Sequence, residues 1–125
     1  NYRMPNINAA LGCAQLENLD RYVADKRETA ARYVEFFKGK EDITFFTEPA
    51  DCKSNYWLNA VVLKDKAAQL DFLEYTNDHG VMTRPVWELM NRLPMFEHCE
   101  TDGLENTEWL ADRVVNIPSS VRLDK

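Results

Sequence analysis

The order of its helical and extended segments predicts an α+β fold for this chain. A helical pattern comes first, two β-rich segments follow, and helix and strand then alternate, giving the order α-β-β-α-β-α-β. Such an order favours a small, mostly antiparallel sheet with a long N-terminal helix and two further helices packed on one face. The 125 residues are enough for one hydrophobic core, so we expect a single domain over residues 1–125.

The first element is a long helix that we predict from Pro5 to Lys38. Proline suits the first helical turn, where its missing N–H costs nothing, and Gly39 is a typical helix stop. The apolar residues at helical spacing are Leu16, Leu19, Val23, Ala30, Val34 and Phe37.

The beginning of this helix carries almost no charge. No charged side chain occurs between Arg3 and Glu17, whereas charges recur at almost every turn from Glu17 to Lys40. A helix that is apolar on several sides is normally covered on several sides. We therefore expect this chain to be a fragment, or a small domain that works against another domain or subunit.

Two strands should follow the first helix. Ile43–Phe46 is a short strand candidate, and Tyr56–Leu63 is the stronger one because it is rich in aromatic and branched residues. The nearly unbroken apolar run of the second strand predicts burial on both of its faces.

A second helix is predicted over Lys66–His79, with Asp65 as its N-cap and Gly80 as its end. Val81–Arg84 should then form a third strand, which Pro85 terminates.

A last helix is predicted over Leu104–Arg113. The segment Val115–Ser120 then returns as an extended edge strand, because a proline such as Pro118 is tolerated only at the end or edge of a sheet.

Composition narrows the classes of function. The net charge is −6 and the acidic residues are spread along the chain, which argues against nucleic acid as a main partner. Cys13, Cys52 and Cys99 form no paired motif and are odd in number, so we expect reduced thiols in a cytoplasm and no metal site. No apolar run approaches the roughly 20 residues that a membrane span needs.

Several segments together resemble the C-terminal domain of the DegT/DnrJ-type sugar aminotransferases. In chain order they are Asn1–Met4, Ile7, Ala9–Gly12 and Ala14–Leu16; Arg27, Ala31 and Tyr33; Tyr56–Leu63; His79–Pro85; Leu93–Phe96; and Ile117–Ser120. The resemblance covers essentially the whole chain, and the segment from Arg84 to Phe96 is most similar to enzymes that make precursors of legionaminic-type sugars.

The resemblance implies the small domain of a fold-type I, pyridoxal phosphate-dependent aminotransferase. Such an enzyme moves an amino group from an amino acid, here expected to be glutamate, to a nucleotide-linked keto-sugar in bacterial surface polysaccharide biosynthesis, and it is expected to be a cytoplasmic homodimer. The cofactor needs a lysine for its Schiff base, and no lysine here lies in a context like the family's lysine loop. We therefore expect no catalytic residue in this chain and no activity from it alone.

Four residues are the candidate binding sites that the resemblance suggests. Asn1 would reach the cofactor phosphate of the neighbouring subunit, and Arg3 would make an ionic contact near the active site or the substrate diphosphate. Arg84 would be an anion partner, and Trp87 would be a platform for the sugar or the base, because a planar ring offers a large contact area. The plainer alternatives are a helix cap for Asn1, surface cations for both arginines and core packing for Trp87.

Two other functions stay open from the residues alone. The apolar face of Ile7–Leu16 would suit a dimerisation module without enzymatic activity, and Cys99 or His98 would be needed for an independent small enzyme. His79 is more simply a cap at a helix C-terminus. The remaining aromatic residues are expected in the core: Tyr22, Tyr33, Phe36, Phe37, Phe45, Phe46, Phe72 and Trp109.

Overall fold

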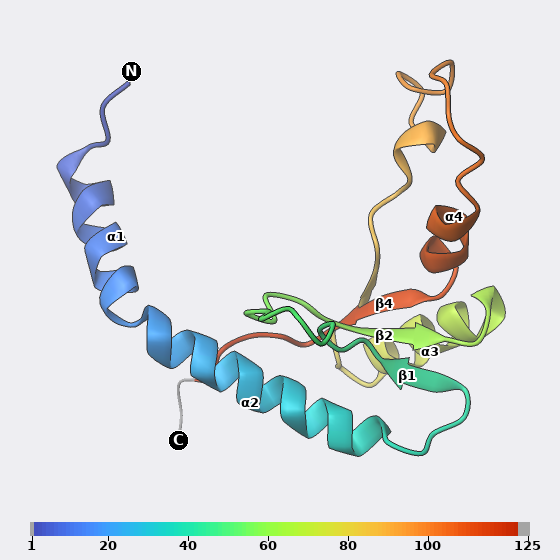
Figure 1. The fold of residues 1–125 in the computed structure, drawn as a ribbon, viewed down its shortest axis with the longest axis horizontal. Coiled ribbons are helices and arrows are strands. Elements are labelled where there is room, and N and C mark those ends of the chain that lie inside the picture. The colour runs from blue at the N-terminus through green and yellow to red at the C-terminus, as the bar shows by residue number, and fades with distance from the viewer. Residues whose placement is uncertain (1, 123–125) are drawn as a thin grey trace.

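A computed structural model of the chain describes residues 2–122 (Figure 1). Its elements are α1 (Asn6–Glu17), α2 (Leu19–Phe37), β1 (Ile43–Phe45), β2 (Asn59–Leu63), α3 (Lys66–Asp78), β3 (Arg84–Pro85), a 3-10 turn η1 (Met90–Arg92), α4 (Glu105–Ala111) and β4 (Val114–Ile117). The order of helices and strands matches the α+β prediction. Among the helices described, none combines the length and apolarity that crossing a bilayer requires.

The four strands form one sheet in the order β1-β2-β4-β3, and every neighbouring pair is antiparallel. β4 therefore lies inside the sheet between β2 and β3, and the prediction of an edge strand there is wrong. Pro118 follows directly after β4, so it sits at the strand's end and removes no hydrogen bond from the ladder.

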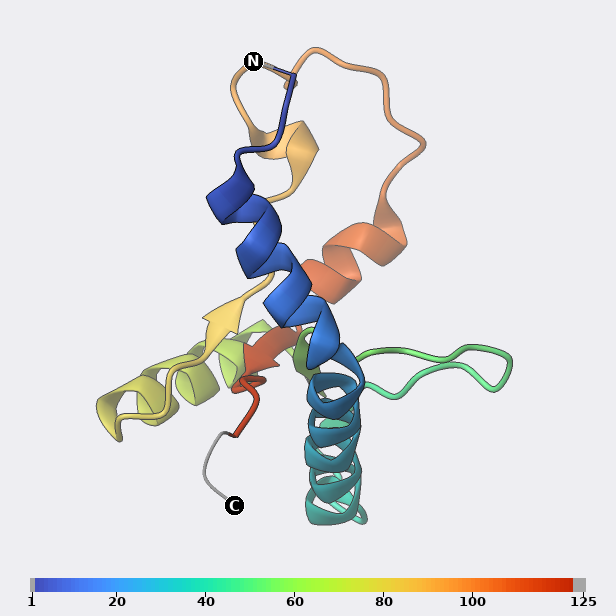
Figure 2. The ribbon, with the colours of Figure 1, turned by 90° about the vertical axis from the view of Figure 1, so that its left-hand side faces the viewer.

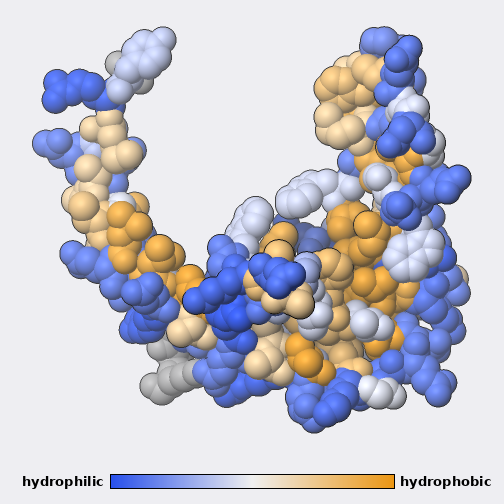
Figure 3. All heavy atoms as spheres, viewed as in Figure 1, coloured by the Kyte–Doolittle hydropathy of each residue, from blue (hydrophilic) through white to orange (hydrophobic). Residues whose placement is uncertain are grey.

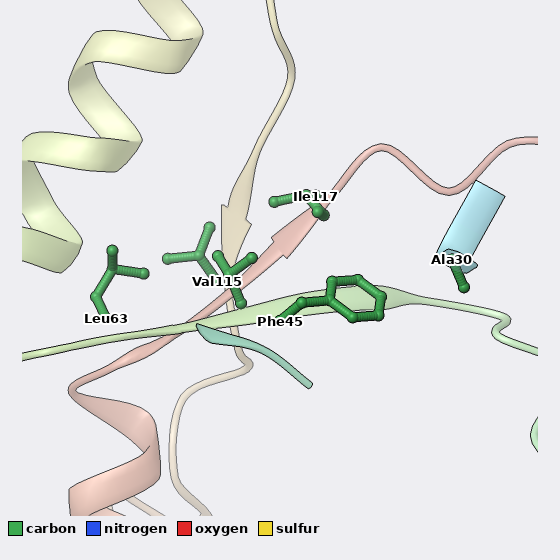
Figure 4. Packing of buried hydrophobic residues seen from close by; sticks show 6 residues of the cluster. Ala30, Phe45, Leu63, Val115 and Ile117 are labelled. Atoms are coloured by element: carbon green, nitrogen blue, oxygen red, sulfur yellow. The ribbon is translucent and has the colours of Figure 1, made fainter. Parts of the chain in front are cut away.

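One face of the sheet carries the core. The register places Phe45 opposite Val61, and Val61 opposite Val115, so all three side chains point to the same side. Ala30 of α2 packs with them, and Figure 4 shows the cluster they form. The partly buried residues around the cluster come largely from α2 and α3: Tyr33, Phe37, Ala68, Phe72 and Leu73, with Ile43 and Tyr56. The predicted packing of helices on one face is confirmed for α2 and α3.

β2 is shorter and less enclosed than its apolar sequence suggested. Its residues alternate between buried and partly buried, so burial on both faces is wrong. The predicted strand cannot start at Tyr56, because Tyr56 has a φ of +47°, in the left-handed region that an extended strand excludes, and β2 begins three residues later at Asn59.

The predicted long helix is interrupted at Asn18, which separates α1 from α2. The Asn18 side chain donates to the carbonyl of Ala14 at 2.9 Å, and its backbone N–H turns to the carbonyl of Gln15 at 3.1 Å. An asparagine that bonds locally in this way competes with the regular helical pattern. Figure 1 and Figure 2 both show α1 rising from the N-terminal end of α2, and Figure 1 shows it well separated from the sheet.

α3 has the predicted cap, but the strand after it is displaced. Asp65 accepts a hydrogen bond from the Ala68 N–H at 2.8 Å, and Gly80 follows the helix with a φ of +75°. Val81 still belongs to the helix ending, because its N–H donates to the Thr76 carbonyl at 2.8 Å. β3 is therefore only Arg84–Pro85 instead of Val81–Arg84.

Much apolar surface remains outside the core. α1 contains no buried residue, and orange, apolar atoms are exposed along it in the arm at the left of Figure 3. Ile7 is 82% exposed. Of the aromatic residues that we expected in the core, Phe45 is buried as predicted. The prediction is wrong for three others that are half exposed or more: Phe36, Phe46 and Trp109.

We predict that α1 drives association of the 125-residue chain with itself. An apolar helix with no buried residue leaves a patch that an isolated monomer seldom exposes. Sedimentation should show dimers or larger species, and the Ile7→Glu, Leu11→Glu double substitution should shift the chain towards monomer. A strict monomer whose amides in α1 are strongly protected from exchange would contradict this prediction.

Candidate functional site

The candidate site is a groove of about 610 Å³ where β2 begins, β4 ends and β3 runs alongside. Its lining comes from four separate parts of the chain, so it exists only in the folded domain. The residues that line it are Lys26, Trp57, Leu58, Met82, Arg84, Pro85, Trp87, Asn116, Ile117, Pro118, Ser119 and Ser120.

The groove is basic in an acidic protein. Lys26 and Arg84 line it, and none of its described lining residues is acidic, although the chain as a whole has a net charge of −6. Cations concentrated in a concave surface attract anionic ligands. The charge pattern therefore suits a ligand with negative charge.

Arg84 lies on the sheet face opposite the core. Its register partner is Asn116, whose neighbours Val115 and Ile117 point into the core, so Arg84 points the other way. The guanidinium donates to Met82 Sδ at 3.5 Å. A thioether is a weak acceptor, so this contact leaves most of the guanidinium's hydrogen-bonding capacity unspent.

Two indole rings flank the same groove. Trp87 is 76% exposed and Trp57 is 66% exposed, so neither ring is packed in the core of the described domain. Exposed rings beside a basic groove are suited to stacking against a planar or ring-shaped ligand. The structure thus places Arg84 and Trp87, two of the candidate binding residues, in the lining of one groove. Their binding roles stay predictions.

Lys26 of α2 closes one end of the groove. Its Nζ donates to the Ser119 carbonyl at 2.6 Å and to the Trp57 carbonyl at 3.3 Å. Ser119 is held further, because its Oγ accepts from the Asn59 N–H and donates to the Ile117 carbonyl, each at 2.7 Å.

Arg27, the next residue of α2, holds the loop that leads to Trp57. Its guanidinium forms a bidentate salt bridge with the Glu48 carboxylate, with N···O distances of 2.7 and 3.0 Å, and also donates to the Ser54 carbonyl. The Ser54 N–H donates to the same carboxylate. The hydrogen bonds from Arg27, and then that from Ser54, lower the pKa of Glu48 from 4.5 to about 2. The Arg27 guanidinium also lies 5.6 Å from the centroid of the Tyr56 ring.

The other candidate residues that the structure describes are not among the lining residues of the groove. Arg3 is exposed before the start of α1. Asn1 falls outside the described residues, so its role stays a prediction. His79 Nδ1 lies 2.7 Å from the Tyr75 carbonyl, which agrees with a role at the helix end. His98 and Cys99 are exposed, and nowhere in residues 2–122 do three potential metal-ligating side chains come together.

Lys26 and Trp57 also line the groove, although they are not among the candidate residues predicted from the sequence. In the sequence, Lys26 is one of many charges along a helix, and Trp57 belongs to an apolar segment typical of a strand. No local pattern links the two residues, because the carbonyls that bind Lys26 lie 31 and 93 residues further along the chain.

Comparison with known proteins gives a consistent result. Residues 1–125 match the DegT/DnrJ/EryC1/StrS aminotransferase family. EpsN of Bacillus subtilis (strain 168), provisionally named a pyridoxal phosphate-dependent aminotransferase, is 32% identical over 95% of this chain and 32% of its own length. The GDP-perosamine synthase of Escherichia coli O157:H7 is 30% identical over 95% of this chain and 32% of its own length.

A solved structure agrees in fold. The sugar aminotransferase CalS13 from Micromonospora echinospora superposes with a TM-score of 0.81 at 26% identity, over 100% of this chain and 33% of CalS13. The chain thus spans about a third of the length of the relatives it matches.

We predict that the Arg27–Glu48 pair makes the domain sensitive to acid. The pKa of Glu48 is lower in the folded state than the ordinary 4.5, so the pair's stabilisation is complete above about pH 4.5 and is lost as the pH falls towards about 2. The difference in unfolding free energy between the native chain and Glu48→Gln should shrink across that window in urea titrations.

The control for this prediction is the Arg27→Met background. Without the guanidinium, the effect of Glu48→Gln should change much less with pH, because the largest cause of the lowered pKa has been removed. An equal pH dependence in both backgrounds would show that the carboxylate does not titrate through Arg27.

Proposed function

This chain belongs to the DegT/DnrJ/EryC1/StrS aminotransferase family, and from that premise we propose that residues 1–125 are the small C-terminal domain of a larger pyridoxal phosphate-dependent enzyme. The enzyme would transfer an amino group, with glutamate as donor, to a nucleotide-linked keto-sugar in the cytoplasm of a bacterium that builds surface polysaccharide. The curated relatives support this proposal, since their names include GDP-perosamine synthases.

The observation that carries the proposal is the basic groove with two exposed indoles. A nucleotide-sugar combines a diphosphate, a flat base and a sugar ring. Arg84 offers a cation with spare donors, and Trp57 and Trp87 offer two ring faces. We propose that the groove lines the approach of this substrate to the reacting centre, with Arg84 at its anionic part and Trp87 at its sugar or base.

The described residues do not fit the cofactor by themselves. The lysine that lines the candidate groove is Lys26, and its ammonium group already donates to two backbone carbonyls. An imine-forming lysine needs an enclosed setting that lowers its pKa. We therefore place the lysine and most cofactor contacts in the part of the enzyme beyond residues 1–125, and we keep Asn1 as a proposed contact to the cofactor phosphate across a homodimer.

A dimerisation function is compatible with this proposal. The apolar surface of α1, centred on Ile7 and Leu11, has no cover within residues 2–122. We propose that α1 and Arg3 lie at the junction with the larger domain and the second subunit. The role of the chain as a module for dimerisation alone is the second candidate.

The direct test uses the full-length protein that contains this chain. We predict that, with glutamate as donor, it converts at least one nucleotide diphosphate keto-sugar from a panel that includes GDP-linked and UDP-linked 4-keto-6-deoxy sugars. The 125-residue chain alone should show no borohydride-reducible absorbance with pyridoxal phosphate. Repeated turnover of glutamate with a 2-oxo acid as the amino acceptor, and with no nucleotide-sugar of the panel accepted, would overturn the substrate class, and no reaction at all would favour the dimerisation module.

We predict that Trp87→Ala in the full-length enzyme raises the KM for the nucleotide-sugar while the half-reaction with glutamate stays nearly unchanged. The amino donor does not need the groove surface, so only acceptor binding should lose the contact. A rise of about tenfold corresponds to roughly 1.4 kcal/mol, the size expected for one aromatic platform.

The matched control is Trp109→Ala. Trp109 is half exposed and lies outside the groove, where its ring centroid is 4.6 Å from the Arg113 guanidinium. This variant should leave the KM of the nucleotide-sugar unaltered. Equal losses in both half-reactions of Trp87→Ala, with a lower melting temperature, would show that Trp87 is a packing residue.

A further inference from the structure

Two backbone segments that are far apart in sequence form the two walls of the groove beside Lys26. One wall is Trp57 and Leu58, just before β2, and the other is Pro118 to Ser120, just after β4. Neither segment is part of the sheet ladder, because β2 begins at Asn59 and β4 ends at Ile117. The ladder ends at the Asn59–Ile117 pair, so beyond that pair the relative position of the two segments depends on further contacts.

Lys26 supplies a contact that joins these two walls from α2. Its ammonium group donates to the Ser119 carbonyl at 2.6 Å and to the Trp57 carbonyl at 3.3 Å, so one charged donor bridges both segments. Hydrogen bonds from a charged donor are stronger than those between neutral groups. Lys26 belongs to α2, which is anchored independently in the core through Ala30.

A second contact joins the walls at the end of the ladder, because Ser119 Oγ accepts from the Asn59 N–H at 2.7 Å, and each wall has further supports of its own. The Tyr33 hydroxyl donates to the Pro118 carbonyl at 3.1 Å, and burial raises the pKa of Tyr33, which keeps that proton in place. On the other wall, the Trp57 N–H donates to Asn55 Oδ1 at 3.0 Å. The bonds of Tyr33 and Asn55 each support one wall, whereas Lys26 connects the Trp57 carbonyl to the Ser119 carbonyl beyond the end of the ladder.

We propose that Lys26 is a positioning residue that sets the width of the groove and the placement of the Trp57 indole on its wall. This inference rests on the proposed function of the groove as the approach of the nucleotide-sugar. Lys26 acts through backbone carbonyls, so its effect on the substrate is indirect and passes through Trp57 and Ser119.

The test replaces Lys26 by methionine, which keeps a long flexible side chain and removes the donor. In the full-length enzyme, hydrogen–deuterium exchange should rise locally at residues 57–59 and 118–122, by about tenfold where amides are otherwise protected. The KM for the nucleotide-sugar should rise by about five- to tenfold, as expected when hydrogen bonds from a charged group are lost. The half-reaction with glutamate should keep its rate.

Two variants make the result specific to the bridge. Lys26→Arg keeps a cation that can donate to two carbonyls, so it should restore most of the exchange protection and most of the KM. Lys64→Met removes an exposed lysine that pairs with Asp42 at 3.3 Å away from the groove, and it should change neither measurement.

The outcomes separate this inference from the proposed function. Unchanged exchange at both walls in Lys26→Met overturns the inference, and a raised KM with unchanged exchange would show instead that Lys26 touches the anionic substrate directly. Raised exchange at both walls with an unchanged KM also overturns it, because the groove width would then not matter to the substrate. If the native enzyme converts no nucleotide-sugar, the proposed function fails, and the effect of Lys26 on the substrate fails with it. The exchange data would still show whether Lys26 holds the two walls of the groove together.

Discussion

Three consecutive side chains of α2 hold the domain's irregular segments, and the candidate site depends on them. Asp25 accepts a hydrogen bond from the backbone N–H of Arg122 at 3.1 Å, and Lys26 donates to the Ser119 carbonyl. Arg27 forms a salt bridge with Glu48. The sheet and the two helices on its buried face form a regular layer without them. The groove, in contrast, is built from segments outside that layer, so its shape depends on polar contacts made by one helix.

Periodicity and capping signals predicted the elements that depend on local sequence. Asp65 and Gly80 bound α3 as expected, because a cap and a left-handed glycine act within a few residues. The failures came from interactions that periodicity does not record. Asn18 interrupts the first helix by bonding to Ala14, and β4 is interior because its partners on both sides come from earlier in the chain.

The candidate site was predictable only in part. The resemblance led to Arg84 and Trp87, which follow one another closely in sequence and do line one groove. The roles of Trp57 and Lys26 were not predictable in this way, because the hydrogen bonds from Lys26 join residues that are 31 and 93 positions apart. A single sequence shows which residue types are present, but tertiary packing alone determines which of them share a surface.

The interior position of β4 has a consequence for how the domain is made. β3 has its only described neighbour in β4, yet residues 86–113 are synthesised between them. The β1–β2 hairpin can form early because its partners are close in sequence, whereas β3 and one edge of β2 wait for the last described strand. During translation the chain therefore carries an unpaired strand edge until residue 117 has left the ribosome, and this interval is when it is most exposed to misassembly.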